Sequence, residues 1–201
     1  MAMLAACPDR CGKAEMRIVS GELRGRPIRA PAGDATRPTS DRTRQAVFNI
    51  LEHAPWSPGL QGRRVLDLFA GSGAMGLEAL SHGAAACLFV ESAGSALAAI
   101  RGNIEAFSLG ARARVLRQDA TTLGSRSPVE APFDFALLDP PYGKGLGPTA
   151  LAALADGGWL ADDAVATLEI AAEEAEPPLG GYALLDARRY GAARVLFLKP
   201  G

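Results

Sequence analysis

Residues 65–76 read Val-Leu-Asp-Leu-Phe-Ala-Gly-Ser-Gly-Ala-Met-Gly, an apolar run that passes directly into a glycine-rich loop. Gly71, Gly73 and Gly76 have the Gly-x-Gly-x-x-Gly spacing that lets a nucleotide approach the backbone between a strand and a helix. The helix start offers N–H groups, which favour electron-rich ligand atoms. Glu91 follows Gly71 by twenty positions, where a carboxylate can accept both hydroxyls of a ribose. The stretch therefore predicts a nucleotide-binding strand, loop and helix rather than an ordinary tight turn.

Short apolar runs alternate with helical patterns through the rest of the chain. The predicted order is strand 64–69, helix 74–81, strand 86–90, helix 92–107, strands 113–117 and 133–138, helix 148–156, and strands 164–170, 182–187 and 193–198. This order predicts an α/β, Rossmann-like, doubly wound fold with a seven-stranded, mainly parallel sheet. The last two strands are too close for a helical crossover, so the final strand should be antiparallel.

The segment before this sheet is a basic arm. We predict a short hairpin over residues 17–31, a helix over 41–54 that Ser40 or Asp41 caps, and a linker at 55–62. Residues 16–45 contain seven arginines and three acidic residues, whereas the chain from residue 46 onward has 12 basic and 17 acidic residues. A basic arm fits a polyanion partner, although arginines scattered over a solvated surface would give the same count.

Three segments follow from this organisation: a leader at 1–15, the basic arm at 16–62 and the main domain at 63–201. We expect the leader to be disordered or to precede the true start at Met16. It lacks the basic region and the long apolar region of a secretion signal, so we expect a cytoplasmic protein.

Composition excludes several classes of protein. The chain has 201 residues, 48% of them hydrophobic, and a net charge of −1, which is typical of a soluble globular domain. No apolar run approaches the roughly 20 residues needed to cross a bilayer. Cys7, Cys11 and Cys87 lack the spacing of metal ligands, so we expect no metal site.

An acidic residue inside the first predicted strand discriminates between the possible cofactors. Asp67 would direct its carboxylate toward the glycine loop, where it would repel a pyrophosphate and attract an ammonium group. The methionine part of S-adenosylmethionine carries such an ammonium, so Asp67 favours this cofactor, with S-adenosylhomocysteine as product, over NAD. Asp119 could read an adenine amino group or cap a turn. The expected cofactor-binding residues are Asp67, Phe69, Ala70, Gly71, Gly73, Glu91, Ser92, Asp119 and Ala120.

The tetrapeptide Asp139-Pro140-Pro141-Tyr142 follows the strand predicted at 133–138. The two prolines remove N–H donors, which leaves the Asp139 carboxylate and the Pro140 carbonyl as acceptors for an incoming NH₂ group. Tyr142 offers a flat face on which a planar base can stack. We expect these four residues to be catalytic, because two acceptors can hold the lone pair of a conjugated amine toward a methyl donor.

The chain from Met16 to its end resembles the bacterial 16S rRNA (guanine(966)-N2)-methyltransferases. The resemblance rests on four motifs. They are Met16-Arg17-Ile18-Val19-Ser20-Gly21 with Arg24-Gly25-Arg26, Arg37-Pro38-Thr39-Ser40-Asp41-Arg42-x-Arg44 followed by Phe48-Asn49-Ile50-Leu51, the segment 67–79 around the glycine loop, and Asp139-Pro140-Pro141-Tyr142. The arm motif with Arg37-Pro38-Thr39 is the specific part, since many amino methyltransferases share the glycine loop and the tetrapeptide.

This resemblance implies methylation of the exocyclic N2 of one guanine in 16S rRNA, on the small ribosomal subunit. It also places Arg37, Thr39 and Arg42 near the cofactor and the target base. Arg24, Arg26 and Arg29 would contact phosphates and position the RNA, from which the target guanine must be splayed out. We expect a monomer that acts without a metal or a membrane.

Three alternatives remain open at this point. A methyltransferase for adenine N6 or a protein glutamine amide would use a similar tetrapeptide, but such enzymes often carry Asn in place of Asp139 and bring a larger recognition domain. An NAD(P)-dependent oxidoreductase would explain the glycine loop and Glu91 but neither Asp67 nor the tetrapeptide. A catalytically idle RNA-binding module would leave the pocket residues without a role.

Overall fold

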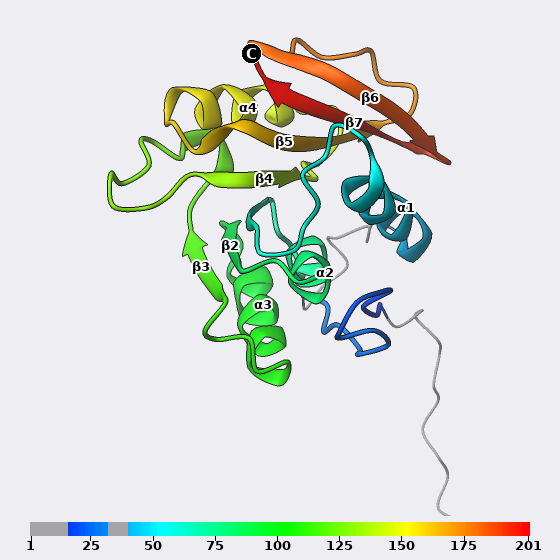
Figure 1. Ribbon diagram of the computed structural model, residues 1–201, viewed down its shortest axis with the longest axis vertical. Helices are drawn as coiled ribbons and strands as arrows, with labels where there is room; N and C mark the ends of the chain where they lie inside the picture. Colours follow the sequence, from blue (N-terminus) through cyan, green and yellow to red (C-terminus); the bar gives the residue numbers. More distant parts are fainter. Residues whose placement is uncertain (1–15, 32–39) are drawn as a thin grey trace, which may run out of the picture.

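A computed structural model describes residues 16–31 and 40–201. Its centre is one seven-stranded sheet in the order β3-β2-β1-β4-β5-β7-β6 (Figure 1). The strands are β1 (Arg64–Leu68), β2 (Ala86–Glu91), β3 (Ala113–Arg117), β4 (Phe133–Leu138), β5 (Leu160–Ala171), β6 (Tyr182–Tyr190) and β7 (Ala193–Pro200). Strands β1 to β5 are parallel, and β7 runs antiparallel to both β5 and β6. The predicted α/β fold is therefore confirmed.

The helices divide between the two faces of the sheet. They are α1 (Asp41–His53), α2 (Ala74–Ser81), α3 (Gly94–Ala106), the 3₁₀ helix η1 (Ala120–Thr122) and α4 (Leu146–Asp156). Alternate residues of β1 point to opposite faces, because the side-chain period of a strand is two. Val65 packs in the core beneath α1, α2 and α3, whereas Leu66 packs in the core beneath η1 and α4. Of the helices in the described part of the chain, none is long and apolar enough to cross a membrane.

Several element boundaries near the carboxyl end differ from the predicted ones, and two of them change which residues lie in strands. Arg188 and Arg189, predicted in the tip of the last hairpin, lie within β6 and pair with Val195 and Arg194 of β7. The reversal takes only two residues, and Gly191 supplies the positive φ of +60° that such a turn needs. Strand β5 begins at Leu160, four residues earlier than predicted, because Leu160 pairs with Phe133 ahead of a register shift, beyond which Phe135 pairs with Val165.

The amino-terminal arm is smaller than a full hairpin. Arg17 and Pro27 form a single antiparallel bridge, which the Gly25 N–H to Ile18 carbonyl bond closes at 2.8 Å. Proline at 27 cannot donate to a longer ladder. The following helix α1 is capped by the Ser40 hydroxyl, which accepts from the Thr43 N–H, and it ends at His53 with Ala54 as its C-cap.

The arm is anchored on α2 by buried polar groups. Glu78 is fully buried and accepts hydrogen bonds from the Val19 and Ser20 N–H groups at 3.0 and 2.8 Å. The buried Arg44 of α1 donates to the same carboxylate at 3.2 Å. Apolar residues of the arm, including Ile18 and Ile28, join the same core as the sheet. The arm thus packs as part of the sheet's own core, and the boundary at residue 62 stays a prediction.

Candidate active site at the carboxyl edge of the sheet

The glycine loop connects β1 to α2 at the carboxyl edge of the sheet. Its backbone takes the left-handed conformation at three positions, with φ of +58° at Phe69, +56° at Gly71 and +80° at Gly73. Phe69 is the unusual member, because a side chain in this region of φ is strained and such strain clusters at functional sites. The Ala70 N–H donates to the Val90 carbonyl at 3.2 Å, which ties the loop to the end of β2.

The loop glycines have different physical roles. A Cβ atom at Gly76 would lie 2.4 Å from the Phe89 ring and 2.6 Å from the Cys87 Sγ, so glycine lets α2 approach β2. Among the atoms of the described residues, a Cβ atom at Gly71 would meet only the Phe69 carbonyl oxygen, at 3.9 Å. The space around Gly71 therefore fits a ligand that comes close to the backbone.

Glu91 organises the loop through its backbone. One carboxylate oxygen accepts from the Gly71 N–H at 2.9 Å, and the other accepts from the Ser92 and Ala93 N–H groups at 2.7 and 2.8 Å. Glu91 is half-buried and Ser92 is exposed, at the point where β2 ends. The carboxylate is thus fixed beside the loop, and its predicted contact with ribose hydroxyls stays a prediction.

Asp67 is a buried carboxyl group directly beneath the loop. It is 2% exposed, and its Oδ2 accepts from the Gly76 N–H at 2.9 Å. Burial raises the pKa of Asp67 well above its usual value, and the carboxylates of Asp139 and Glu91 add to the rise, while the Gly76 N–H opposes it. A cation placed beside Asp67 would relieve the cost of its negative charge, which fits the ammonium predicted there.

The tetrapeptide predicted to be catalytic, Asp139-Pro140-Pro141-Tyr142, follows β4 at the same edge. Asp139 and Tyr142 are half-buried, Pro140 is buried and Pro141 is exposed. Asp139 contributes to the raised pKa of Asp67, so the two carboxylates lie within electrostatic reach of each other. The predicted catalytic residue and the predicted ammonium-binding residue therefore share one site.

Two polar residues of β5 belong to this site and were not predicted from the sequence. Strand pairing sets Leu137 opposite Thr167 and Leu138 opposite Leu168, and the same register places Asp139 level with Glu169. Asp139, Thr167 and Glu169 line one small hollow, which Val47 of α1 and Met75 of α2 help to close. The only signal in the sequence was the presence of Thr167 and Glu169 in the otherwise apolar run predicted as a strand at 164–170.

Asp119 takes the capping role that the sequence left open. Its Oδ1 accepts from the Thr121 N–H at 2.8 Å and from the Thr121 hydroxyl at 2.7 Å, and these bonds lower the pKa of Asp119. Asp119 is exposed and Ala120 is buried. By capping the short helix η1, Asp119 is held just beyond the end of β3. Its contact with an adenine amino group stays a prediction.

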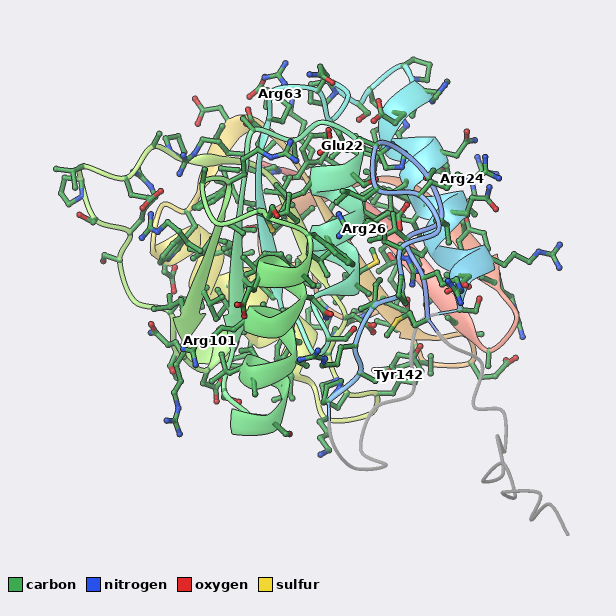
Figure 2. The ribbon with its side chains drawn as sticks, turned by 90° about the horizontal axis from the view of Figure 1, so that it is seen from below. Glu22, Arg24, Arg26, Arg63, Arg101 and Tyr142 are labelled. Atoms are coloured by element: carbon green, nitrogen blue, oxygen red, sulfur yellow. The ribbon has the colours of Figure 1, made fainter. Side chains whose placement is uncertain are left out.

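The arm presents several of the arginines predicted to contact RNA. The arm runs between α1 and α2, with Arg24 and Arg26 along it (Figure 2). Arg24 is exposed, and Arg26 lies over the Phe107 ring at 4.6 Å and donates to the Ala106 carbonyl at 2.5 Å. Arg29 and Arg42 are exposed. Arg37 and Thr39 lie outside the described residues.

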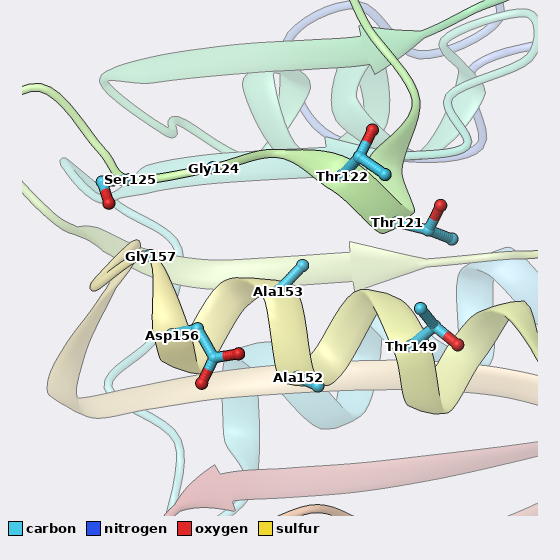
Figure 3. A pocket seen from close by; sticks show the side chains of 9 residues that line it. All are labelled: Thr121, Thr122, Gly124, Ser125, Thr149, Ala152, Ala153, Asp156 and Gly157. Atoms are coloured by element: carbon cyan, nitrogen blue, oxygen red, sulfur yellow. The ribbon is translucent and has the colours of Figure 1, made fainter.

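A separate hollow of about 340 Å³ lies between η1 and α4 (Figure 3). It is lined by small and hydroxyl-bearing side chains together with Asp156. Residues of η1 and α4 pack in the core on the face of the sheet opposite α1, α2 and α3. Of the described residues, none that was predicted for the active site lines this hollow.

Comparisons with known proteins agree with this geometry. Residues 16–199 match the family model described as "Conserved hypothetical protein 95". The ribosomal RNA small subunit methyltransferase D of Escherichia coli K12 is 35% identical over 85% of this chain and 82% of its own length. A candidate rRNA methyltransferase of Bacillus subtilis, YlbH, is 41% identical over 63% of this chain and 67% of its own length.

The fold has a close match among solved structures as well. A candidate methyltransferase of Escherichia coli, yhhF, superposes with a TM-score of 0.77 at 33% identity, over 92% of this chain and 98% of that one. The magnesium protoporphyrin IX methyltransferase of Synechocystis, solved with bound SAM, is 17% identical with a TM-score of 0.59 and shares the fold. Because the family model spans most of the chain and the Escherichia coli relative is similar along 85% of it, the chain belongs to the family of the bacterial ribosomal RNA small subunit methyltransferases D.

Proposed function

We propose that this protein transfers a methyl group from S-adenosylmethionine to the exocyclic N2 of a guanine in 16S rRNA of the small ribosomal subunit. The family supports an rRNA methyltransferase, because its relatives carry that name. One observation carries the proposal further: Asp139, followed by two prolines, lies at the same edge of the sheet as the buried Asp67 and within its electrostatic reach.

The residues around the glycine loop fit this cofactor. When bound, S-adenosylmethionine supplies a methyl group on a sulfonium, which a nucleophile can displace. Asp67 would bind the ammonium and Glu91 the ribose hydroxyls, since both carboxylates already border the loop. The space beside Gly71, where a Cβ atom would meet only the Phe69 carbonyl oxygen among the described residues, would admit the cofactor. Ala70, Ser92, Asp119 and Ala120 would complete the lining.

The tetrapeptide supplies the acceptors for the guanine amine. The lone pair of this amine is delocalised into the ring, so the amine is a poor nucleophile. The Asp139 carboxylate and the Pro140 carbonyl would accept its two N–H bonds and direct the lone pair toward the methyl donor. Asp139 would then accept the proton that the methylated amine loses, or this proton would pass directly to water. Tyr142 would stack on the base.

The arm would hold the RNA near this site. Arg24, Arg26 and Arg29 lie on the segment that packs against α2 and α3, and each can contact a phosphate without reading the sequence. Arg42, in the first turn of α1, and Arg37 and Thr39 before it would contact the splayed guanine or the cofactor.

The direct test is to identify the methylated nucleoside. Small subunits from cells that lack the enzyme are incubated with the protein and labelled S-adenosylmethionine, and the rRNA is digested. We expect N2-methylguanosine from the wild-type protein. A label on adenine N6, or on a ribosomal protein, would contradict the proposal and favour one of the other amino substrates.

The Asp139→Ala variant tests the catalytic assignment. We expect it to lose methyl transfer by roughly 1,000-fold or more, on the order expected when a preorganised acceptor is removed, while S-adenosylhomocysteine still binds. Asp162→Ala, which changes an exposed aspartate of β5, is the control and should act at the wild-type rate. Wild-type turnover by Asp139→Ala would refute the assignment.

A further inference from the structure

Strand β5 buries a carboxylate where its neighbours are apolar. Glu169 is 8% exposed and lies between the buried Leu168 and Ile170. An isolated buried carboxylate is unfavourable, so it persists in a fold where hydrogen-bond donors stabilise it or where function requires it. Glu169 shares its hollow with Asp139, the proposed acceptor of the guanine amine. A second carboxylate thus lies next to the reacting end of the site.

Glu169 binds the tyrosine of the tetrapeptide. The Tyr142 hydroxyl donates a hydrogen bond to Glu169 Oε1. The two residues come from different elements, the loop after β4 and the middle of the sheet at β5. A hydrogen bond between a neutral donor and a carboxylate is stronger than one between two neutral groups. Glu169 therefore fixes the far end of the Tyr142 side chain against the sheet.

The backbone around Tyr142 makes this attachment important. Gly143 and Gly145 follow the tyrosine with φ of +69° and +64°, and no atom of the described residues lies within 4 Å of a Cβ placed at either position. Glycine gives the chain more conformational freedom than any other residue. The ring of Tyr142 is therefore held at one end by a glycine-rich connection to α4 and at the other end by the carboxylate of Glu169.

We propose that Glu169 is a positioning residue for Tyr142. By accepting the phenol hydroxyl, it sets the plane of the ring beside Asp139, so that the target base stacks in the orientation that brings its amine to the two acceptors. This inference rests on the proposed function and deepens it. In this role Glu169 acts through the tyrosine and not on the methyl donor or the amine.

A double-mutant cycle tests the inference. Tyr142→Phe removes the hydroxyl and keeps the ring, and Glu169→Leu removes the acceptor. We expect each change to lower kcat/KM for the small subunit by about 10- to 100-fold, the worth of one hydrogen bond to a charged group. The double variant should lose no more than either single one, because both remove the same interaction. The KM for S-adenosylmethionine should not change.

Glu169→Gln is the conservative variant that separates positioning from general stability. Its amide oxygen can still accept the phenol hydroxyl, so we expect it to retain at least a third of the wild-type kcat/KM. Additive losses in the cycle, or wild-type kinetics in Tyr142→Phe, would overturn the inference. If Glu169→Leu fails to fold, the other two variants still test the inference. Tyr142→Phe must then lose activity, and Glu169→Gln must retain it.

A measurement that does not depend on catalysis tests this inference separately from the proposed function. The chain has three tyrosines, so ring signals of isotope-labelled tyrosine can be assigned by NMR, that of Tyr142 from its disappearance in Tyr142→Phe. In Glu169→Leu the Tyr142 signal should shift and sharpen toward that of a freely turning ring, while those of Tyr182 and Tyr190 stay in place. An unchanged Tyr142 signal would refute positioning, whichever nucleoside the wild-type protein methylates.

Discussion

The burial of the Asp67 carboxyl group lowers the stability of the fold by an amount that depends on pH. Its raised pKa means that the folded state binds the proton more tightly than the unfolded state, where an aspartate titrates near pH ~3.9. Stability therefore falls as the pH rises from about 4 through the raised pKa, and it stays lower above that. Asp67→Asn should remove this loss, because a neutral amide oxygen can still accept the Gly76 N–H.

We expect Asp67→Asn without cofactor to unfold at a higher temperature than the wild-type protein at pH 8, with a difference that vanishes near pH 4. Thermal unfolding at several pH values measures this. The same variant should bind S-adenosylhomocysteine about tenfold more weakly, because its ammonium loses a charged partner. A variant that is less stable than the wild-type protein at pH 8 would show that the negative charge does not destabilise the fold.

Gly76 illustrates how a single hydrogen atom in place of a side chain can decide helix packing. Alanine normally stabilises a helix relative to glycine by about 1 kcal/mol. At Gly76 the new methyl would overlap Phe89 and Cys87, so we expect Gly76→Ala to destabilise the protein by about 1–3 kcal/mol. Gly94→Ala, in α3 with open space around it, is the control and should be neutral or stabilising. Equal unfolding midpoints in urea would contradict this account.

Single residues were predictable from the sequence where the motif itself carries them. Asp67 lies inside the apolar run that leads into the glycine loop, and Asp139 ends an apolar run just before two prolines, so local chemistry indicates a role for each. Glu169 is thirty residues from Asp139, and the two meet only through the pairing of β4 with β5. Glu78 and Arg44 likewise meet across 34 residues. Such pairs depend on register and packing, which one sequence without structure does not define.

At the scale of elements, helix α3 joins the arm to the glycine loop through one buried side chain. Asn103 is 2% exposed, and its amide nitrogen donates to the Ser72 and Arg29 carbonyls, each at 3.0 Å. Its amide oxygen accepts from the Arg29 N–H at 2.8 Å. The loop that would hold the cofactor and the arm that would hold the RNA are therefore fastened to the same residue of α3.

We expect Asn103→Leu to lower stability by about 1–3 kcal/mol, because it leaves buried backbone groups without their partner. Release of the Ser72 carbonyl should also weaken S-adenosylhomocysteine binding about fivefold, which calorimetry measures. Asn49→Leu, on the exposed side of α1, is the control for the change of side chain. A loss of stability with unchanged affinity would mean that the loop keeps its shape without Asn103.

The bounds of helices and strands were predictable where the hydrophobic periodicity of the sequence is strong. They were uncertain where pairing with a neighbouring strand determines how far a strand extends. The helix at 74–81 was predicted to the residue, because a glycine cap precedes it and a glycine follows it closely. The extension of β6 over Arg188 and Arg189 was missed, since charged residues near a glycine are typical of a turn. Pairing with β7 stabilises these residues as an edge strand, which tolerates charge on its exposed side.

At the scale of the molecule, charge and packing divide the protein in different ways. The arm has an excess of basic residues and the chain downstream has an excess of acidic ones, yet Ile18, Phe48 and Leu51 share one core with the sheet. Glu78 of α2 neutralises Arg44 within that core, so this arginine is committed to structure. Arg24, Arg26 and Arg29 are exposed on the arm, and these are the residues proposed to contact RNA.

Replacing Arg24 and Arg26 together tests whether this arm is the RNA surface. Each arginine that no longer binds a phosphate should reduce the slope of log K against log salt by about 0.7–0.9. We therefore expect the double alanine variant to reduce the slope of small-subunit binding by about 1.5 between roughly 50 and 200 mM salt. Arg188→Ala with Arg189→Ala removes the same charge from β6 and should leave the slope unchanged. A reduced slope in that control, with a normal slope in the arm variant, would move the RNA surface to the edge of the sheet.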